Sequence, residues 1–316
     1  MKTYVIGHLK PDTDSVVAAM ALANLYQNVS CFGYSNAQAA ITEAINPETT
    51  FLMNKFGLTA PAIISAADLA SDDQVVLIDH NEESQRLEGL DPNQIVEIID
   101  HHKANLNFEQ PIYLTFKTWG SSNTIVYFLM KENNFVPNAK LASLMLAAIL
   151  SDTVGFKSPT CTPKDKELAL ELAKVAGIDD LETFTLEIFK AKSDVSKLSP
   201  QEIVKNDYKI FDFAGKKVMI DQLETVEQAK IITDKKTELL KAMAEVKNEL
   251  QADMIFVAIT DILKVNTKLL ILDEAAAAIA QKAFGGEATE QVLDIGGRLS
   301  RKKEIAPPIE KAFNKS

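Results

Sequence analysis

Acidic residues and histidines gather at four points of this sequence, each directly after an apolar stretch. The first reads Gly-His-Leu-Lys-Pro-Asp-Thr-Asp-Ser over residues 7–15, and the second Ile-Asp-His-Asn-Glu over 78–82. The third is Ile-Asp-His-His at 99–102, and the fourth is Ile-Leu-Ser-Asp-Thr at 149–153. The chain has only 4 histidines, and all of them lie in the first three segments. This concentration predicts one site built from carboxylates and imidazoles.

The chemistry that such a set supports is metal-assisted hydrolysis. Imidazole and carboxylate ligands without thiolate suit Mn²⁺ or Co²⁺ and are compatible with Zn²⁺, whereas a purely carboxylate set would favour Mg²⁺. Water is a weak nucleophile at neutral pH, and nearby cations lower its pKa. Two cations roughly 3.5–4 Å apart, sharing a carboxylate, also suit in-line attack on phosphorus.

Each segment taken alone has a simpler explanation. Asp14 could cap the helix that follows it, since Asp is a preferred N-cap residue, but a cap does not explain His8 or Asp12. Asp79 could be a turn residue, and Asp152 could end a helix. His101 and His102 could be two surface histidines in a loop. The joint occurrence of all four segments favours the metal site.

The elements that must position these residues alternate between strands and helices. Apolar and β-branched runs predict strands at Tyr4–Gly7, Val75–Ile78 and Ile95–Ile99. Helical spacing predicts helices at Ser15–Tyr26, Ser121–Met130 and Ala139–Leu150. The alternation predicts an α/β domain with a mostly parallel sheet that is flanked by helices and covered on both faces. Ligands of such sheets bind beyond the carboxyl ends of the strands, where these Asp and His residues stand.

The second half of the chain reads as a smaller α/β domain. Helices predicted at 163–176 and 181–190 precede a small, polar stretch at 191–200, which we interpret as a linker. Beyond it we predict strands at 208–211, 218–220, 254–260 and 268–272 and a long helix at about 226–251. The predicted domains are therefore 1–190 and 201–316.

A basic cluster near the C-terminus follows Gly296 and Gly297. It contains Arg298, Arg301, Lys302 and Lys303. Arg offers bidentate contacts to phosphate oxygens and Lys a mobile point charge. An ordinary solvated basic patch is the alternative explanation.

The composition argues against several classes of protein. Of 316 residues, 33 are Lys or Arg and 44 are Asp or Glu, so the net charge is −11. Such a chain is a poor partner for nucleic acid, which binds through cationic contacts to phosphate. Cys31 and Cys161 are too few for a disulfide scaffold, and no window is long and apolar enough to span a membrane. We expect a soluble cytoplasmic protein.

The four segments together resemble the DHH phosphoesterase superfamily, and within it the manganese-dependent family II inorganic pyrophosphatases. The similarity covers essentially the whole chain and includes 156–162 and Ser300-Arg301-Lys302-Lys303. It implies hydrolysis of pyrophosphate to two phosphates. It further implies two Mn²⁺ ions per subunit with Co²⁺ as a substitute, Mg²⁺ accompanying the substrate, and a homodimer formed through the edge of the N-terminal sheet.

The resemblance also implies a role for each residue of the site. His8, Asp12 and Asp79 would hold one metal ion. Asp14, Asp79, His101 and Asp152 would hold the other, with Asp79 bridging the two. His102 would face the substrate and donate a proton toward the leaving phosphate, and Asp100 could orient a histidine. His80 has no role that the sequence specifies.

By the same resemblance, Arg301, Lys302 and Lys209 would bind the substrate phosphates, although Lys205 is close enough to replace Lys209 in the alignment. Because these cations belong to the second domain, we expect the active site in the cleft between the domains, with domain closure completing it.

Two other functions compete with this prediction. Another DHH phosphoesterase would act on short oligonucleotides, nucleotide phosphates or polyphosphate, but those relatives typically end in a GGGH-type motif. This chain has Gly-Gly-Arg-Leu-Ser-Arg-Lys-Lys there and no histidine after His102. A catalytically silent regulator would lack ligands, whereas every expected ligand position is filled.

Overall fold

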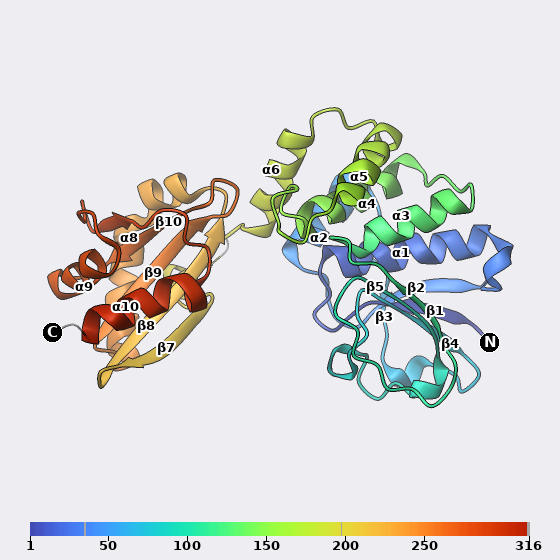
Figure 1. Ribbon diagram of the computed structural model, residues 1–316, viewed down its shortest axis with the longest axis horizontal. Coiled ribbons are helices and arrows are strands. Elements are labelled where there is room, and N and C mark those ends of the chain that lie inside the picture. The colour runs from blue at the N-terminus through green and yellow to red at the C-terminus, as the bar shows by residue number, and fades with distance from the viewer. Residues whose placement is uncertain (35, 197, 315–316) are drawn as a thin grey trace. The chain divides into compact units, whose positions relative to one another are not determined.

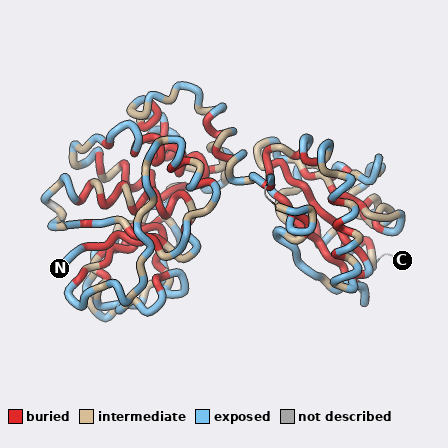
Figure 2. The backbone as a smooth tube through the Cα atoms, turned by 180° about the vertical axis from the view of Figure 1, so that it is seen from behind, coloured by how far each residue is buried: buried red, intermediate tan, exposed pale blue. Residues whose placement is uncertain are grey.

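The computed structural model in Figure 1 describes residues 1–34, 36–196 and 198–314. The chain divides into two compact units, Met1–Ala191 and Lys192–Ser316, which we call unit 1 and unit 2. Each unit has buried side chains of its own along its strands and the inner sides of its helices (Figure 2). The predicted linker, 191–200, includes residue 197, which lies outside the described residues; α6 ends at Lys192 and α7 begins at Pro200.

Unit 1 contains a six-stranded parallel sheet with the order β3-β2-β1-β4-β5-β6. Its strands are β1 (Thr3–Ile6), β2 (Ala37–Ile41), β3 (Ala62–Ile63), β4 (Gln74–Ile78), β5 (Ile95–Asp100) and β6 (Tyr113–Phe116). Its helices are α1 (Thr13–Asn28), α2 (Pro47–Phe56), α3 (Ser122–Glu132), α4 (Ala139–Asp152), α5 (Pro163–Ala176) and α6 (Leu181–Lys192). The predicted α/β class and parallel sheet are confirmed.

The two faces of this sheet are covered differently. Val5, Val76 and Ile99 point to the face on which α1 and α3 pack, while α2, α4 and α5 pack against the helices of that side (Figure 1). Ile6 and Leu77 point to the other face, which is covered by loops and short 3₁₀ turns in place of α-helices. Burial on both faces explains why the central strands are almost continuously apolar.

The strand order places the Asp and His segments side by side. From β1 the chain builds outward to β2 and β3, and then returns to add β4, β5 and β6 on the other side of β1. The crossover makes β1 and β4 neighbours, and such a switch point leaves a crevice at the carboxyl ends of the strands. His8 follows β1 and Asp79 follows β4, so both lie at this crevice.

Unit 2 is built on a mixed five-stranded sheet with the order β11-β10-β9-β8-β7, in which only the β8–β9 pair is parallel. The strands are β7 (Tyr208–Phe213), β8 (Lys216–Thr225), β9 (Met254–Asp261), β10 (Asn266–Ile271) and β11 (Val292–Asp294). The helices are α7 (Pro200–Val204), α8 (Gln228–Glu249), α9 (Glu274–Phe284) and α10 (Ala306–Asn314), with a π-helical turn at Arg301–Ile305. Helices α7 and α8 pack on one face, and α9 and α10 on the other.

In the part of the chain that the structure describes, no helix combines the length and the apolar character needed to cross a membrane.

Candidate metal centre

The loop between β1 and α1, together with the first turn of α1, carries three of the predicted ligands. Gly7 is the first residue of the loop. A larger residue would not fit there, because its Cβ would lie only 1.9 Å from Ser15 Oγ. The backbone N–H of His8 donates to that Oγ at 3.1 Å. Asp12 is the N-cap of α1 and accepts from the backbone N–H of Ser15 at 2.9 Å. Asp14 is therefore not the cap, and its buried side chain needs another explanation.

The Asp14 carboxylate is held by the first residues of α3 and the residue before them. The backbone N–H of Ser122 donates to its Oδ2 at 2.7 Å, and the Asn123 amide donates to its Oδ1 at 2.8 Å. The Ser121 hydroxyl also donates to Oδ1. A helix N-terminus favours a negative charge, yet burial, together with the nearby Asp79, raises the pKa of Asp14 to about 7. The hydrogen bonds from Ser121, Ser122 and Asn123 hold the Asp14 carboxylate in one orientation.

Asp79 lies at the centre of the cluster. Its φ of 65° is in the left-handed region, which is uncommon for a residue other than glycine. The Ser122 hydroxyl donates to Oδ1 at 2.8 Å. His8 Nε2 lies 3.5 Å from Oδ2, and His101 Nε2 lies 3.2 Å from Oδ1. The two oxygens of one carboxylate thus face two different imidazoles. Burial opposes ionisation, but the imidazoles outweigh it and hold the pKa of Asp79 below its usual range.

The two imidazoles are oriented in the same way. Nδ1 of His8 lies 2.7 Å from the carbonyl oxygen of Leu9, and Nδ1 of His101 lies 2.9 Å from that of Trp119. Because a carbonyl only accepts, each Nδ1 carries the hydrogen, and Nε2 is directed at the carboxylates. This is the usual arrangement of a metal-bound histidine.

The charges in the cluster need a cation. Burial lowers the pKa of His8, but Asp12 and Asp79 outweigh it and raise the value to about 11. For His101 burial also lowers the pKa, and Asp79 with the other carboxylates raises it to about 10. Burial and the neighbouring carboxylates raise the pKa of Asp152 well above its ordinary value. His8, His101 and Asp152 therefore favour their protonated forms. A metal ion bound to the same atoms would replace those protons.

The ligand atoms form compact groups on both sides of Asp79. His8, Asp12 and Asp79 form one group, with His8 Nε2 3.6 Å from Asp12 Oδ1. Asp14, His101 and Asp152 form another, with His101 Nε2 3.6 Å from Asp152 Oδ2. In each group the ligand atoms lie within 4.8 Å of one another. The buried Nε2 of His101 has no hydrogen-bond partner within the described residues. The donor set therefore fits divalent cations.

His102 has a different environment from His101. Its Nδ1 lies 2.9 Å from Asp100 Oδ1, and its side chain is 55% exposed. The hydrogen bond to Asp100 raises the pKa of His102, more than burial lowers it. Asn81 donates to the other oxygen of Asp100. His80 is buried, and burial lowers its pKa to about 4. Of the two residues without an assigned role, Asp100 thus contacts a site histidine, and His80 packs below the site.

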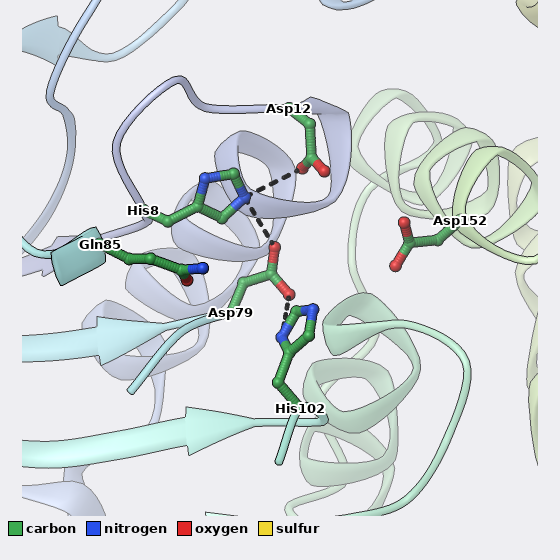
Figure 3. Close-up of a pocket in the computed structure, with 6 residues that line it drawn as sticks. All are labelled: His8, Asp12, Asp79, Gln85, His102 and Asp152. Atoms are coloured by element: carbon green, nitrogen blue, oxygen red, sulfur yellow. Dashed lines mark ion pairs between the residues drawn. The ribbon is translucent and has the colours of Figure 1, made fainter. Parts of the chain in front are cut away.

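Figure 3 shows the pocket that these residues line, with a volume of about 100 Å³. Five of its six lining residues were predicted from the sequence, and the sixth is Gln85, whose side chain points toward the pocket. Gln85 ends a 3₁₀ turn, and its backbone carbonyl accepts from Leu9. A lone glutamine outside the Asp and His segments gives no signal that sequence reasoning could have used. Ser121, Ser122 and Asn123 were likewise missed as partners of the ligands.

The predicted substrate cations all lie in unit 2, and the structure gives them different environments. Lys209 on β7 and Lys302 in the π-helical turn are exposed. Arg301 is only 8% exposed and pairs with Asp207 at 3.0 Å. Lys205, the alternative to Lys209, pairs with Glu249 at 2.9 Å. That pairing favours Lys209 as the cation available to a ligand.

Two protein families match parts of this chain. Residues 2–149 match the family described as "DHH family, N-terminal domain", and residues 186–312 match the "DHHA2 domain". A manganese-dependent inorganic pyrophosphatase of Methanocaldococcus jannaschii is 40% identical over 98% of this chain and 99% of its own length. One of Methanothrix thermoacetophila is 38% identical over 99% and 98%. The crystal structure of a Methanococcus jannaschii putative family II inorganic pyrophosphatase superposes with a TM-score of 0.62, at 38% identity over 99% of both chains.

Proposed function

Since the chain belongs to the manganese-dependent inorganic pyrophosphatases and hydrolyses pyrophosphate to two phosphates, we propose that six side chains of unit 1 hold two Mn²⁺ ions for this reaction. When bound, such a pair stabilises negative charge on phosphate oxygens and makes water a stronger nucleophile.

The ligands divide into two sets that share one member. His8, Asp12 and Asp79 form the first set; Asp14, Asp79, His101 and Asp152 form the second. The observation that supports this most directly is the orientation of Asp79, whose Oδ2 lies 3.5 Å from His8 Nε2 while its Oδ1 lies 3.2 Å from His101 Nε2. A carboxylate with one oxygen toward each set is suited to bridging. The Ser122 hydroxyl and the left-handed backbone fix that orientation.

His102 is the proposed proton donor to the leaving phosphate. Asp100 accepts from its Nδ1, which keeps the ring in one orientation with its other nitrogen free to meet a substrate oxygen. The side chain lines the same pocket as Asp79 and Asp152. A general acid needs this position: close to the reacting group, partly exposed, and supported by a buried carboxylate.

Lys209, Arg301 and Lys302 are the proposed phosphate-binding cations. Pyrophosphate carries several negative charges, and charge-assisted contacts to phosphate are among the strongest hydrogen bonds that a protein makes. The metal ligands belong to unit 1 and these cations to unit 2, so the proposal requires both units to act on one substrate. Small-angle scattering with and without a non-hydrolysable analogue tests this requirement, and identical profiles would count against it.

Three further properties complete the proposal. Co²⁺ can replace Mn²⁺, because imidazole and carboxylate ligands suit both ions, and Mg²⁺ accompanies the anionic substrate. The chain is a cytoplasmic homodimer that pairs through the edge of the unit 1 sheet. The edge strand β6 exposes Tyr113 by 67% and Leu114 by 45%, which supports such pairing. Light scattering on the purified protein gives the mass, and a monomer would contradict the dimer.

The assay for the function itself is phosphate release from pyrophosphate with Mn²⁺. A short oligonucleotide and a nucleotide 3′-phosphate serve as competing substrates in parallel reactions. We expect release from pyrophosphate alone. Faster release from either competitor would contradict the proposal.

A further inference from the structure

One side chain attaches the segment Leu299–Lys302 to the sheet of unit 2. Gln222 lies on β8 and is only 6% exposed. Its Oε1 accepts from the backbone N–H of Arg301 at 3.0 Å, and its Nε2 donates to the carbonyl oxygen of Leu299 at 2.8 Å. Nε2 also donates to Thr260 Oγ1 at 3.1 Å. The amide thus holds the backbone on both sides of Ser300.

These contacts define the orientation of the amide. If it were reversed, an N–H would face the N–H of Arg301 and a carbonyl oxygen would face that of Leu299, and both contacts would be repulsive. A buried donor or acceptor left without a partner is costly. Directly before this segment, the Thr267 hydroxyl donates to the carbonyl of Arg298, and it also lies 2.9 Å from Thr260 Oγ1. The segment therefore rests on a connected set of buried polar groups.

The same part of β8 also holds the ion-pair partner of Arg301. The backbone N–H of Asp207 donates to Asp221 Oδ1 at 2.9 Å, and the backbone N–H of Gln222 donates to the carbonyl of Asp207 at 3.2 Å. Asp207 in turn pairs with the Arg301 guanidinium at 3.0 Å. Asp221 and Gln222 therefore fix the backbone of Arg301 and the carboxylate beside its side chain.

The Arg301 side chain is prepared for an additional partner. Its Nε and one terminal nitrogen are buried and have no hydrogen-bond partner in the described part of the chain. Such donors are costly to leave unpaired. A phosphate oxygen could satisfy them only if the guanidinium were held in one place; the ion pair with Asp207 holds the guanidinium, and Gln222 holds the backbone of Arg301.

We infer that Gln222 is a positioning residue for pyrophosphate binding, acting through the Leu299–Lys302 segment. The inference rests on the proposed function, because it takes Arg301 and Lys302 as substrate-binding cations. Gln222 itself touches neither substrate nor metal in this account.

The test replaces Gln222 by methionine, which has a similar size and lacks the amide. We expect the KM for pyrophosphate to rise about tenfold, which corresponds to about 1.4 kcal/mol of binding, while kcat changes less and the bound Mn²⁺ per chain does not change. Hydrogen exchange at the amide of Arg301 should become faster, because its acceptor is lost. Gln222→Glu keeps the acceptor for Arg301 but places a second acceptor against the carbonyl oxygen of Leu299, so its KM should rise at least as far as in Gln222→Met.

Gln228 provides a matched control. It is also a buried glutamine of unit 2, 5% exposed, and its Nε2 donates to the carbonyls of Ile259 and Asn266 at 2.7 and 3.0 Å. Gln228→Met removes a comparable pair of hydrogen bonds away from the Leu299–Lys302 segment. Its thermal midpoint should fall by a similar amount, while its KM stays within about twofold of the unmodified enzyme.

Two results would overturn the inference. One is an unchanged KM in Gln222→Met together with unchanged exchange at Arg301. The other is an equal rise in KM in Gln228→Met, which would trace the effect to general destabilisation. Lys302→Ala separates this failure from failure of the proposed function. If Lys302→Ala raises KM and Gln222→Met does not, only the inference on Gln222 is wrong; if neither does, the assignment of the cations is wrong.

Discussion

The strand ends of unit 1 and the Leu299–Lys302 segment of unit 2 present charged groups in opposite ways. In unit 1, Asp14 and Asp79 are buried, and each is held by hydrogen bonds from the start of α3. In unit 2, Lys302 is exposed, and only Arg301 is buried. Buried like charges at short range need a cation, whereas exposed lysines are satisfied by water. This difference supports the proposal that unit 1 binds the metal ions and unit 2 the substrate anion.

The largest effect should come from removing the shared ligand. Asp79→Ala should lower kcat by roughly a thousandfold or more, since it removes a ligand from both sets and with it the metal-derived activation of water. Bound Mn²⁺, measured by elemental analysis, should fall together with the activity. Asp91→Ala, which removes an exposed carboxylate that caps a short 3₁₀ turn, is the control and should behave as the unmodified enzyme. Retention of full Mn²⁺-dependent activity in Asp79→Ala would refute the bridging role.

His102→Gln should come next, because it removes the proposed proton donor and leaves the metal ligands in place. General acid catalysis is typically worth about a hundredfold to ten-thousandfold, so we expect kcat to fall by a factor in that range. Bound Mn²⁺ should remain at the level of the unmodified enzyme. Loss of the metal in this variant would instead identify His102 as a ligand.

Lys302→Ala tests the other side of the comparison. Removing an exposed cation that meets the substrate should raise KM by roughly ten- to a hundredfold, as expected for one lost charge-assisted hydrogen bond of roughly 1.5–3 kcal/mol. Bound Mn²⁺ should not change. Lys303→Ala, its exposed neighbour in the same turn, is the matched control. An equal rise in KM in the two variants would show that KM depends on the overall charge of the turn and not on the position of Lys302.

The smallest expected effect is on the pH dependence of folding stability, and it involves a buried carboxyl group of unit 1 outside the metal centre. Glu97 on β5 is 3% exposed, accepts from Tyr26 at 2.7 Å, and has its pKa raised from 4.5 to about 7, mainly by burial. The folded state therefore binds this proton more tightly than the unfolded chain, and stability is lost as the pH rises from about 4.5 to about 7. Glu97→Gln should reduce that loss by about 1–3 kcal/mol, with no change in KM. Thermal midpoints at pH 5 and pH 8 measure it, and an equal decline in both proteins would contradict the interpretation.

Much of unit 1 could be predicted because its central strands are strongly patterned. The runs at 75–78 and 95–99 are rich in β-branched residues and, apart from Glu97, apolar, as is typical of buried parallel strands, and each is followed by Asp and His. By contrast, β2 reads Ala-Gln-Ala-Ala-Ile, which carries no strong β preference, and its place in the sheet comes from tertiary packing. Strand β6 and helix α2 were also missed, although Tyr-Leu-Thr-Phe favours a strand and Asn46 before Pro47 is typical of a helix start.

The details of the site depended on contacts that sequence spacing does not encode. Nothing in the segment 7–15 shows that Asp12 and not Asp14 caps the helix, because both stand in front of an apolar run. The contact of Asp14 with Asn123 joins residues 109 positions apart. In unit 2 the burial of Arg301 depends on Asp207 and Gln222, which lie far from it in the sequence. A basic cluster in the sequence therefore predicts a positively charged region, but it does not predict which of its cations is buried.

The most direct test of the central claim, that Asp79 joins two metal ions, is electron paramagnetic resonance of the enzyme loaded with Mn²⁺ at two ions per chain. Ions that share a carboxylate lie roughly 3.5–4 Å apart and are magnetically coupled. We predict a coupled spectrum in the unmodified enzyme and its loss in Asp79→Ala. Two independent six-line Mn²⁺ signals in the fully loaded, unmodified enzyme would contradict it.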